Sequence, residues 1–391
     1  MATDATGAEA LVLTPDWSSP IKVSREFRTT IQTSRSGKEQ RRAVRNRPRK
    51  TVEYSMALIG HSAQTFNQMM KSFVGVDIRI IDVTRSVTIL SMTGAVATVS
   101  EAPGWLADDV ALRSVNNQAL ALVSGVSGNT VTFASGSAWP VGTKIYPLLT
   151  GRIQSGQLTS KLVTDAVQTA SITFKVNPLS EPEIDPAAAP VTFNGREVVL
   201  AKPNWSTAPE VTFSNAFETV DFNYGAIAHY NPIAYTSRAQ KASYLSLNAT
   251  AAAALEDVFV RAKGQRGEFY MPSWQNDMTA TGGAAIGATS FTTSGDVFTY
   301  FDGDTVFTTL CICYADGTYQ FVQIDHLSTS GGNTTVHLAA ALTRAIDSNV
   351  TMICWMPVHR FASDTLTTEW ITDSVAQTQL PVISLEDLPV E

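Results

Sequence analysis

The first clear pattern in the chain is an alternation of apolar and polar residues that begins near residue 22. Val23, Phe27 and Ile31 fall on one face of this alternation, which predicts a half-buried strand over residues 22–33. Residues 34–37 are turn-forming, and residues 41–58 return as a second extended segment in which Pro48 argues against a helix. Together the two segments predict a long hairpin.

Two stripes with helical spacing follow the extended segments. The first predicts a helix capped at Ser62 and ending at Gly75, with core positions Phe66, Met69, Met70 and Phe73. The second predicts a helix capped by Asn248 or Thr250 and ending at Gly264, with core positions Leu255, Val258, Phe259 and Ala262. Because the two sequences differ but keep the same period, we interpret both stripes as packing surfaces and not as cofactor sites.

The two halves of the sequence share a series of motifs in the same order. Trp17 and Val23 recur as Trp205 and Val211 with one common offset, and Tyr54 recurs as Tyr244 with nearly the same offset. Residues 158–167 align with residues 366–375 at one constant offset, without a gap and with part of the positions identical. An internal repeat of this kind decides the architecture before any motif is considered. We therefore predict an internal duplication.

The predicted fold class is mainly β, with two duplicated halves. Each half is expected to be a β-sandwich with one packed helix and an inserted small β-barrel-like module, since short strands alternate there with turns such as Asp316-Gly317. The predicted boundaries are an N-terminal arm (1–12), the first half (13–82 and 151–177) with its inserted module (83–150), a proline-rich linker (178–192), the second half (193–277 and 358–380) with its inserted module (278–357), and a C-terminal tail (381–391).

Composition narrows the class of protein. The 391 residues are 44% hydrophobic and only 16% charged, with a net charge of −7, which suits a β-rich chain that buries surface in an assembly. No apolar run is long enough to cross a bilayer, and the first residues have neither a basic nor an apolar signal region. We therefore expect no membrane span and no signal-directed export.

The sequence contains no convincing catalytic or metal-binding constellation. The five histidines, at 61, 229, 326, 337 and 359, have no ligand spacing, and Ser62 in Gly60-His-Ser lacks the context of a nucleophile elbow. The acidic pairs Glu181/Glu183, with Asp185, and Asp302/Asp304 are interpreted as solvated or turn residues. We therefore expect a protein that is not an enzyme and that has no catalytic site, bound metal or cofactor.

Three cysteines leave one alternative open. Cys311 and Cys313 share one face of a predicted strand, and Cys354 lies far away in the sequence. A metal or iron–sulfur site built from these three is one interpretation. We favour buried, reduced thiols, which behave as small hydrophobic residues.

The sharpest local feature is a basic cluster at residues 35–50, which contains eight Lys or Arg and the single acid Glu39. One interpretation is phosphate binding. The other, which we favour, is an arm that docks on an acidic neighbouring subunit, since the corresponding residues 225–241 contain only Arg238 and Lys241. The predicted subunit-interface residues are Arg35, Gly37, Lys38, Glu39, Arg41, Arg42, Arg45, Arg47, Arg49 and Lys50.

Residues 17–50 contain Trp17 and Pro20, a predicted strand from Thr29 to Thr33, the run Ser34-Arg-Ser-Gly-Lys-Glu-Gln-Arg41, and the arginines that follow it. In these motifs the segment resembles the opening of tail proteins of long-tailed bacteriophages. The segment is also similar to the entry of distal-tail-type proteins. The second copy lacks the Ser-x-Ser-Gly-x-Glu-Gln-Arg run, so the resemblance does not extend to it.

The resemblance implies a structural protein of a tail tip. Such a protein forms a ring that joins the tail tube to the hub and the receptor-binding parts. Its expected partners are copies of itself in a trimeric or hexameric ring, the tail tube protein and the hub or central fibre proteins, with nucleic acid only as DNA passing through a lumen. Its expected location is the virion, after synthesis in the host cytoplasm. The alternatives are a module that binds a glycan or receptor of the host surface, and a tail-associated hydrolase.

Overall fold

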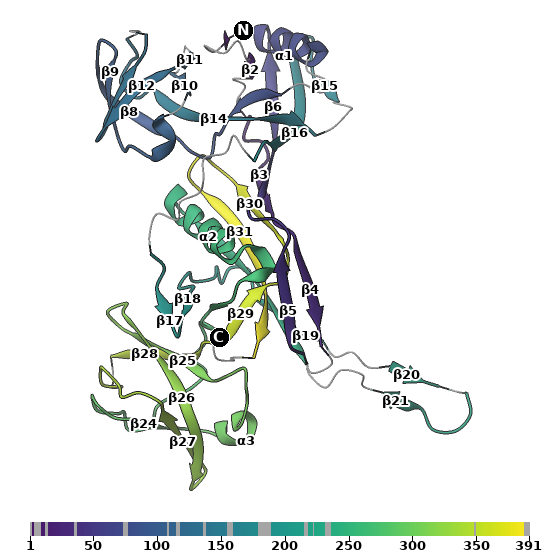
Figure 1. The fold of residues 1–391 in the computed structure, drawn as a ribbon, viewed down its shortest axis with the longest axis vertical. Coiled ribbons are helices and arrows are strands. Elements are labelled where there is room, and N and C mark those ends of the chain that lie inside the picture. The colour runs from purple at the N-terminus through teal and green to yellow at the C-terminus, as the bar shows by residue number, and fades with distance from the viewer. Residues whose placement is uncertain are drawn as a thin grey trace.

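The computed structural model describes residues 2–3, 9–11, 15–34, 37–72, 77–107, 109–114, 118–135, 138–154, 159–178, 189–214, 218–221, 223–230, 236–347 and 349–386. The protein is mainly β with few helices, as predicted. Its α-helices in the described residues are α1 (His61–Ser72), α2 (Ala249–Ala262) and the short α3 (Val297–Phe301), and its 3-10 helices are η1 (Gly104–Ala107) and η2 (Gly264–Arg266). The molecule is elongated, with a curled sheet in the middle and a β module toward each end (Figure 1).

Two groups of four strands form the backbone of this sheet. The first quartet is β15 (Ser160–Leu162), β16 (Val167–Val176), β6 (Arg49–Ile59) and β3 (Ile21–Glu26), paired in that order. The second quartet is β30 (Thr365–Trp370), β31 (Ala376–Leu385), β22 (Ser237–Ser246) and β19 (Glu210–Ser214), also paired in that order. All of these pairings are antiparallel.

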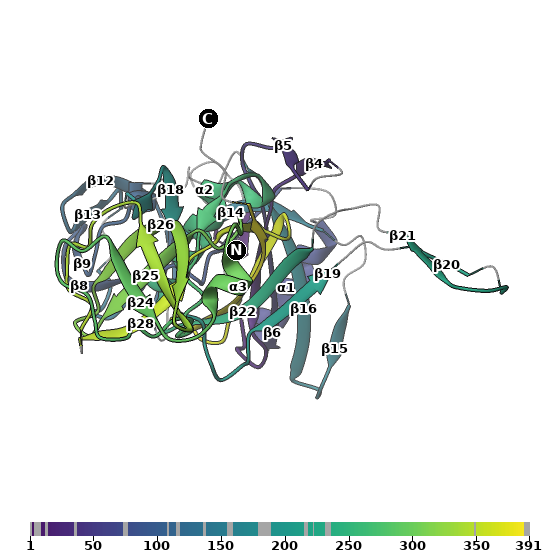
Figure 2. The same cartoon turned by 90° about the horizontal axis from the view of Figure 1, so that it is seen from below.

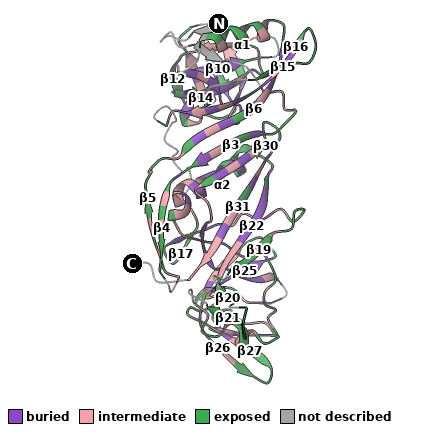
Figure 3. Cartoon of the chain, turned by 90° about the vertical axis from the view of Figure 1, so that its right-hand side faces the viewer, coloured by how far each residue is buried: buried purple, intermediate pink, exposed green. Residues whose placement is uncertain are grey.

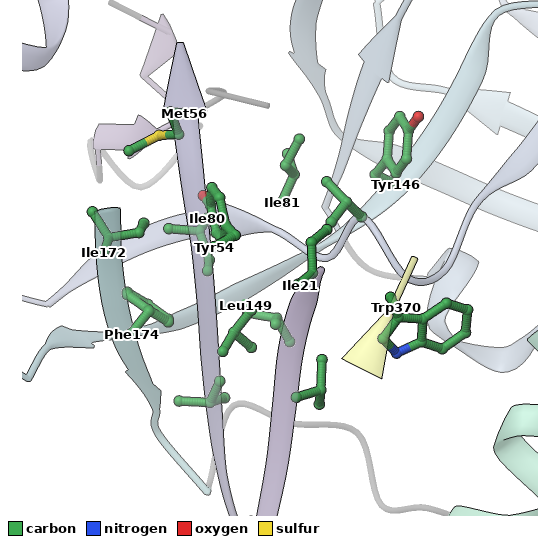
Figure 4. Close-up of a cluster of buried hydrophobic side chains, with 14 of the residues drawn as sticks. Ile21, Tyr54, Met56, Ile80, Ile81, Tyr146, Leu149, Ile172, Phe174 and Trp370 are labelled. Carbon is green, nitrogen blue, oxygen red and sulfur yellow. The ribbon is translucent and has the colours of Figure 1, made fainter. Parts of the chain in front are cut away.

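The two quartets join through β3 and β30. Ile21 lies opposite Trp370, and Glu26 lies opposite Thr365, so eight antiparallel strands run from β15 to β19 without a break. The hydrophobic cores are shared across this junction. Trp370 and Ala376 belong to the core of the first quartet (Figure 4), and Phe27 belongs to the core of the second. The two halves thus bury two core clusters, and each cluster includes one or more side chains from the other half.

Smaller strands extend both quartets in matching places. β14 (Lys144–Ile153) and β7 (Ile78–Ile81) follow β16, and β2 (Glu9–Leu11) adds in parallel to β7. β29 (Val358–Phe361) and β23 (Phe269–Tyr270) follow β31, and β18 (Arg196–Val198) adds in parallel to β23. The predicted N-terminal arm is thus partly a sheet strand. β1 (Ala2–Thr3) pairs with β2, and β17 (Thr192–Phe193) pairs with β18.

The registers of the two quartets coincide at the offsets seen in the sequence. Val23 lies opposite Val52 and Val211 lies opposite Gln240, so both members of this strand pair shift by the same number of positions. Ser160 lies opposite Ala170 and Thr368 lies opposite Thr378, again with an equal shift on both strands. The quartets therefore have the same strand order and register. The duplication itself concerns the origin of the chain and stays a prediction.

Each quartet carries a hairpin and an inserted module. The hairpins are β4 (Thr29–Thr33) with β5 (Glu39–Ala43), and β20 (Glu218–Val220) with β21 (Ala228–Tyr230). The first module contains β8 (Val87–Thr93), β9 (Val96–Val99), β10 (Val110–Arg113), β11 (Gln118–Ala121), β12 (Val123–Ser127) and β13 (Thr130–Phe133) around its own core. The second contains β24 (Ser290–Thr293), β25 (Thr309–Tyr314), β26 (Tyr319–Ser330), β27 (Asn333–Leu338) and β28 (Val350–Trp355).

The helices pack on the sheet through the stripes seen in the sequence. Phe66 is buried and Met70 packs against the same core, while Leu255, Val258 and Phe259 are buried in the second core. The side chain of Met69 and all of Phe73 lie outside the described residues. Asn248 caps α2, since its side-chain oxygen accepts a hydrogen bond of 2.7 Å from the amide of Ala251.

Two expectations about chain ends and caps are wrong. Ser62 lies inside α1, and its hydroxyl bonds back to the amide and carbonyl of Ile59 instead of capping the helix. Residues 381–385 of the predicted tail are part of β31, because Leu380 and Val382 alternate into the second core. Residues 179–188 of the predicted linker lie outside the described residues.

Candidate assembly surfaces

The basic hairpin β4–β5 lies along the part of the molecule that holds the second quartet (Figure 1). Gly37 takes a φ of 90° in its turn, a conformation that glycine adopts without strain, and the amide of Gly37 donates to the carbonyl of Ser34 over 3.0 Å. The turn therefore needs the glycine of the Ser-Gly-x-Glu run, and it sends Glu39 and Arg41 back along the second quartet.

Glu39 forms its ion pair within its own chain. Both of its carboxylate oxygens accept hydrogen bonds of 2.7 Å from the guanidinium of Arg360, and the two side chains are only 10% and 7% exposed. Arg41 pairs with Glu268 and donates to the carbonyl of Arg266 over 3.1 Å. For these two residues the predicted inter-subunit pairing is wrong, because the C-terminal half of the same chain supplies their partners.

Lys50 is also an internal residue. Its ammonium lies 2.7 Å from the carboxylate of Asp82, and both side chains are 2% exposed. Burial alone would raise the pKa of Asp82, but Lys50 and Arg85, with hydrogen bonds from Lys50 and Thr84, hold this pKa well below its usual range. Arg45 forms an ion pair of 3.3 Å with Glu26. Lys50 and Arg45 therefore stabilise the fold of their own chain.

The remaining basic residues of the predicted arm are Lys38, Arg42, Arg47 and Arg49, which are exposed, and Arg35, which lies outside the described residues. Arg49 lines a hollow of about 390 Å³ together with Arg152, Asp77 and Lys175. Arg152 and Asp77 form an ion pair of 2.5 Å there, with side chains 63% and 44% exposed. Four charged side chains therefore line this hollow on the first quartet side.

A buried ion pair stabilises the junction of the quartets. The sequence analysis did not predict this pair. Arg25 on β3 lies 3.0 Å from Glu256 on α2, and their side chains are 2% and 10% exposed. The sequence did contain a signal for the burial of Arg25, because the alternation places Arg25 on the same face as Val23 and Phe27. Helix α2 thus covers the place where β3 meets β30.

The two strands at the ends of the eight-stranded run have open edges. In the described residues β15 pairs only with β16, and β19 pairs only with β22. Every residue of these two strands is exposed, and among them are Leu162 at 81%, Phe213 at 68% and Val211 at 38% exposure. The hairpin β20–β21 beside β19 projects away from the body (Figure 2), and the burial view shows the exposed edge of β19 (Figure 3). Exposed open edges are templates for another strand, and sequence reasoning had not identified them.

The three cysteines do come together. Cys311 and Cys354 lie opposite each other on β25 and β28, and the Sγ atoms of Cys311 and Cys313 are 3.9 Å apart. All three are buried, and their sulfurs lie within 4.8 Å of one another. Hydrogen bonds from the thiols of Cys311 and Cys354 lower the pKa of Cys313, and the Lys202 ammonium adds to this effect. The same contacts raise the pKa of Cys311.

The cluster could contribute at most three thiolates to a soft metal ion. A structural zinc site needs four ligands at tetrahedral geometry, and in the described residues no histidine or carboxylate completes this group. The neighbouring side chains are apolar, including Trp274, Met356 and Val358. The surroundings suit buried thiols.

Of the histidines considered in the sequence, His326 and His337 lie opposite each other on β26 and β27, with their ring centroids 4.1 Å apart. His359 is buried, donates from Nδ1 to the carbonyl of Pro357 over 2.9 Å and accepts at Nε2 from the Ser384 hydroxyl over 3.3 Å. Burial and the nearby Arg238 lower its pKa to about 3. Asp304 caps a turn by accepting from the amides of Val306 and Phe307. Glu181, Glu183 and Asp185 lie outside the described residues.

No protein-family model and no curated protein sequence matches this chain. In the part of the chain that the structure describes, none of the helices has both the length and the apolar character that a membrane span needs.

Proposed function

We propose that this chain is a structural component of a bacteriophage tail tip, where it forms a ring between the tail tube and the hub. The observation that carries the proposal is the pair of open strand edges at the two ends of one continuous sheet. Apolar residues such as Leu162 and Phe213 are exposed on these edges. Exposed apolar edge residues favour an oligomeric assembly over a monomer.

The two open edges are different surfaces, and this difference suits a ring. A contact between the β15 edge of one copy and the β19 edge of the next is head-to-tail, and such contacts produce rings when the rotation closes. Three copies would contribute six similar quartets, which suits a position between a six-fold tube and a three-fold hub. The resemblance of residues 17–50 to tail proteins supplies the biological setting.

Host-surface binding by the inserted modules is the alternative proposal, with less support. A hollow of about 730 Å³ on the second module is lined by residues such as Met278, Ala284 and Ile346 and by no aromatic side chain. Among the described residues of both modules, Tyr300 is the one strongly exposed Phe, Tyr or Trp side chain. Sugar rings are commonly held by stacked aromatic residues, and the described residues of the modules form no such exposed cluster.

The test is the mass and shape of the purified full-length protein. Light scattering after gel filtration gives the number of copies, and negative-stain images give the shape. We expect a hollow ring of three or six copies. A monomer at every concentration, or a solid particle without a lumen, would overturn the proposal.

A further inference from the structure

We propose that copies of this chain join head-to-tail by strand addition, with β19 of one copy pairing with β15 of the next in the register of the internal β3–β30 junction. The inference rests on the proposed ring and names its contact surface. The partner is a second copy of the same chain.

The internal junction is the template for this contact. β3 and β19 occupy the same place in their quartets, and so do β30 and β15. The pairing of β3 with β30 therefore joins an edge strand of the first quartet to the opposite type of edge strand of the second quartet. The other edge strand of each quartet, β15 in the first and β19 in the second, stays open at opposite ends of the eight-stranded run. Joining these left-over edges between copies repeats a contact that the chain already makes within itself.

The transferred register pairs opposite charges. Lys22 lies opposite Glu369 across the internal junction, with the ammonium 3.5 Å from the carboxylate. By the sequence offsets, Glu210 on β19 corresponds to Lys22 on β3, and Lys161 on β15 corresponds to Glu369 on β30. The corresponding pair is therefore also one acid and one base, with the acid and the base on the opposite strands. In the described residues neither of these exposed side chains forms an ion pair within its own chain. Opposite charges directly across a strand pair stabilise it, and like charges destabilise it.

The next position that transfers is a hydroxyl pair. The hydroxyls of Ser24 and Thr367 form a hydrogen bond of 2.9 Å across the internal junction. Their counterparts are Thr212 and Thr159, which again present one hydroxyl from each strand. One register thus matches a charge pair and a hydroxyl pair together.

Apolar surface is exposed where the internal junction buries it. Val23 and Trp370 are 3% and 4% exposed, whereas their counterparts Val211 and Leu162 are 38% and 81% exposed. Burying such side chains is favourable, so pairing of the two edges has a driving force beyond the hydrogen bonds of the strands.

Phe213 on β19 corresponds to Arg25 on β3. The difference between these two residues agrees with the helix that would cover each of them. Arg25 needs Glu256 of α2, which covers the internal junction. The helix in the corresponding place of the next copy is α1, and its sequence contains no acidic residue. An arginine there would be buried without a charge partner, and the exposed Phe213 instead offers an apolar ring to the helix.

The projecting hairpin has a matching place on the next copy. Hairpin β4–β5 contacts Glu268 and Arg360 on the second quartet side. Arg152 has the position of Arg360 on β14, and Asp77 precedes β7 as Glu268 precedes β23. These two residues line the open hollow on the first quartet side. We infer that β20–β21 lies over this hollow in the assembly, as β4–β5 lies over its counterpart within the chain.

The test uses two single-cysteine additions, Lys161→Cys and Glu210→Cys, treated with a short bifunctional thiol reagent. The native cysteines are buried, so the unmodified protein serves as the control. A head-to-tail contact predicts no cross-linked dimer for either variant alone, dimers when the two are mixed, and closed oligomers when one chain carries both. Dimers from a single variant would instead indicate a two-fold contact and would overturn the inference.

A charge exchange tests the register without new cysteines. Lys161→Glu places two acids opposite each other, and we expect self-association to weaken roughly tenfold. Glu210→Lys should weaken it similarly, and the double exchange should restore it. Asp325→Lys, at an exposed position of β26 in the second module, is the matched control and should have no effect. Equal association of all variants would overturn the inference.

The outcomes separate the interface from the ring. A ring without the 161–210 cross-link would overturn the interface and leave the proposed function standing. Cross-linked open filaments would support the interface and overturn the ring. A monomer in every measurement would overturn both.

Discussion

Glu39 and Arg360 are far apart in the chain, and their side chains form two hydrogen bonds of 2.7 Å. This contact holds the hairpin β4–β5 against β29 of the second quartet side. It is the polar counterpart of the β3–β30 junction, since both tie the N-terminal part of the chain to its C-terminal part. Glu39 therefore acts as a clamp within one chain, where the sequence had suggested a contact with a neighbour.

Removing Arg360 should destabilise the protein. In Arg360→Met the nearly buried Glu39 loses its bidentate partner, and we expect the free energy of unfolding to fall by about 3–5 kcal/mol. Urea unfolding measures the change. The exposed pair Lys22–Glu369 provides a control, because Lys22→Ala should cost less than about 1 kcal/mol. Equal effects of the two variants would contradict the clamp.

Asp82 should make the stability sensitive to acid. Its pKa is held below the usual value by Lys50 and Arg85 in spite of burial, so the pair contributes fully above about pH 4, the pKa of an unfolded aspartate. The contribution is lost as the pH falls toward the depressed folded pKa. Asp82→Asn should lower the unfolding free energy at pH 7 and flatten its acid dependence. An unchanged slope below pH 4 would contradict this prediction.

His359 should act at milder acidity. Its folded pKa of about 3 lies below the unfolded value of about 6.5, so the unfolded chain binds the extra proton between these values. Stability is therefore full above about pH 6.5 and falls as the pH drops toward 3, by about 2 kcal/mol between pH 7 and pH 5. His359→Gln should remove this part of the slope. Denaturant titrations at pH 7 and pH 5 compare the two proteins.

The cysteine cluster should behave as buried thiols. We expect Cys311, Cys313 and Cys354 to react with a thiol reagent only after unfolding, because their exposure is at most 4%. We also expect the melting temperature to be unchanged by a chelator. One zinc ion per chain in elemental analysis, together with a lower melting temperature after chelation, would support the metal interpretation instead.

The local elements could be predicted because they depend on nearby residues. The alternation around Val23, the helical stripe at Phe66 and the stripe at Leu255 each require burial of one face, and both the strands and the helices form there. The repeat offsets predicted more than the elements, since they also match the strand registers. The mainly β class followed from the same patterns.

The partners of those elements could not be predicted. Charges at 35–50 looked available because their partners Arg360, Glu268 and Asp82 lie elsewhere in the sequence. The same limit hid the pairing of β3 with β30, since a strand pattern reveals a buried face but not which strand lies at its edge.

The sequence by itself determined the β-rich class and the helical stripes, and it predicted the repeat and the positions of the inserted modules. Only the tertiary structure decided that the two quartets share one sheet and that Arg41, Arg45 and Lys50 of the basic cluster form ion pairs within the chain. It also decided that β15 and β19 are the edges left open. The physical reason is that side-chain alternation is local, whereas strand pairing and ion pairing depend on which distant segments the folded chain brings together.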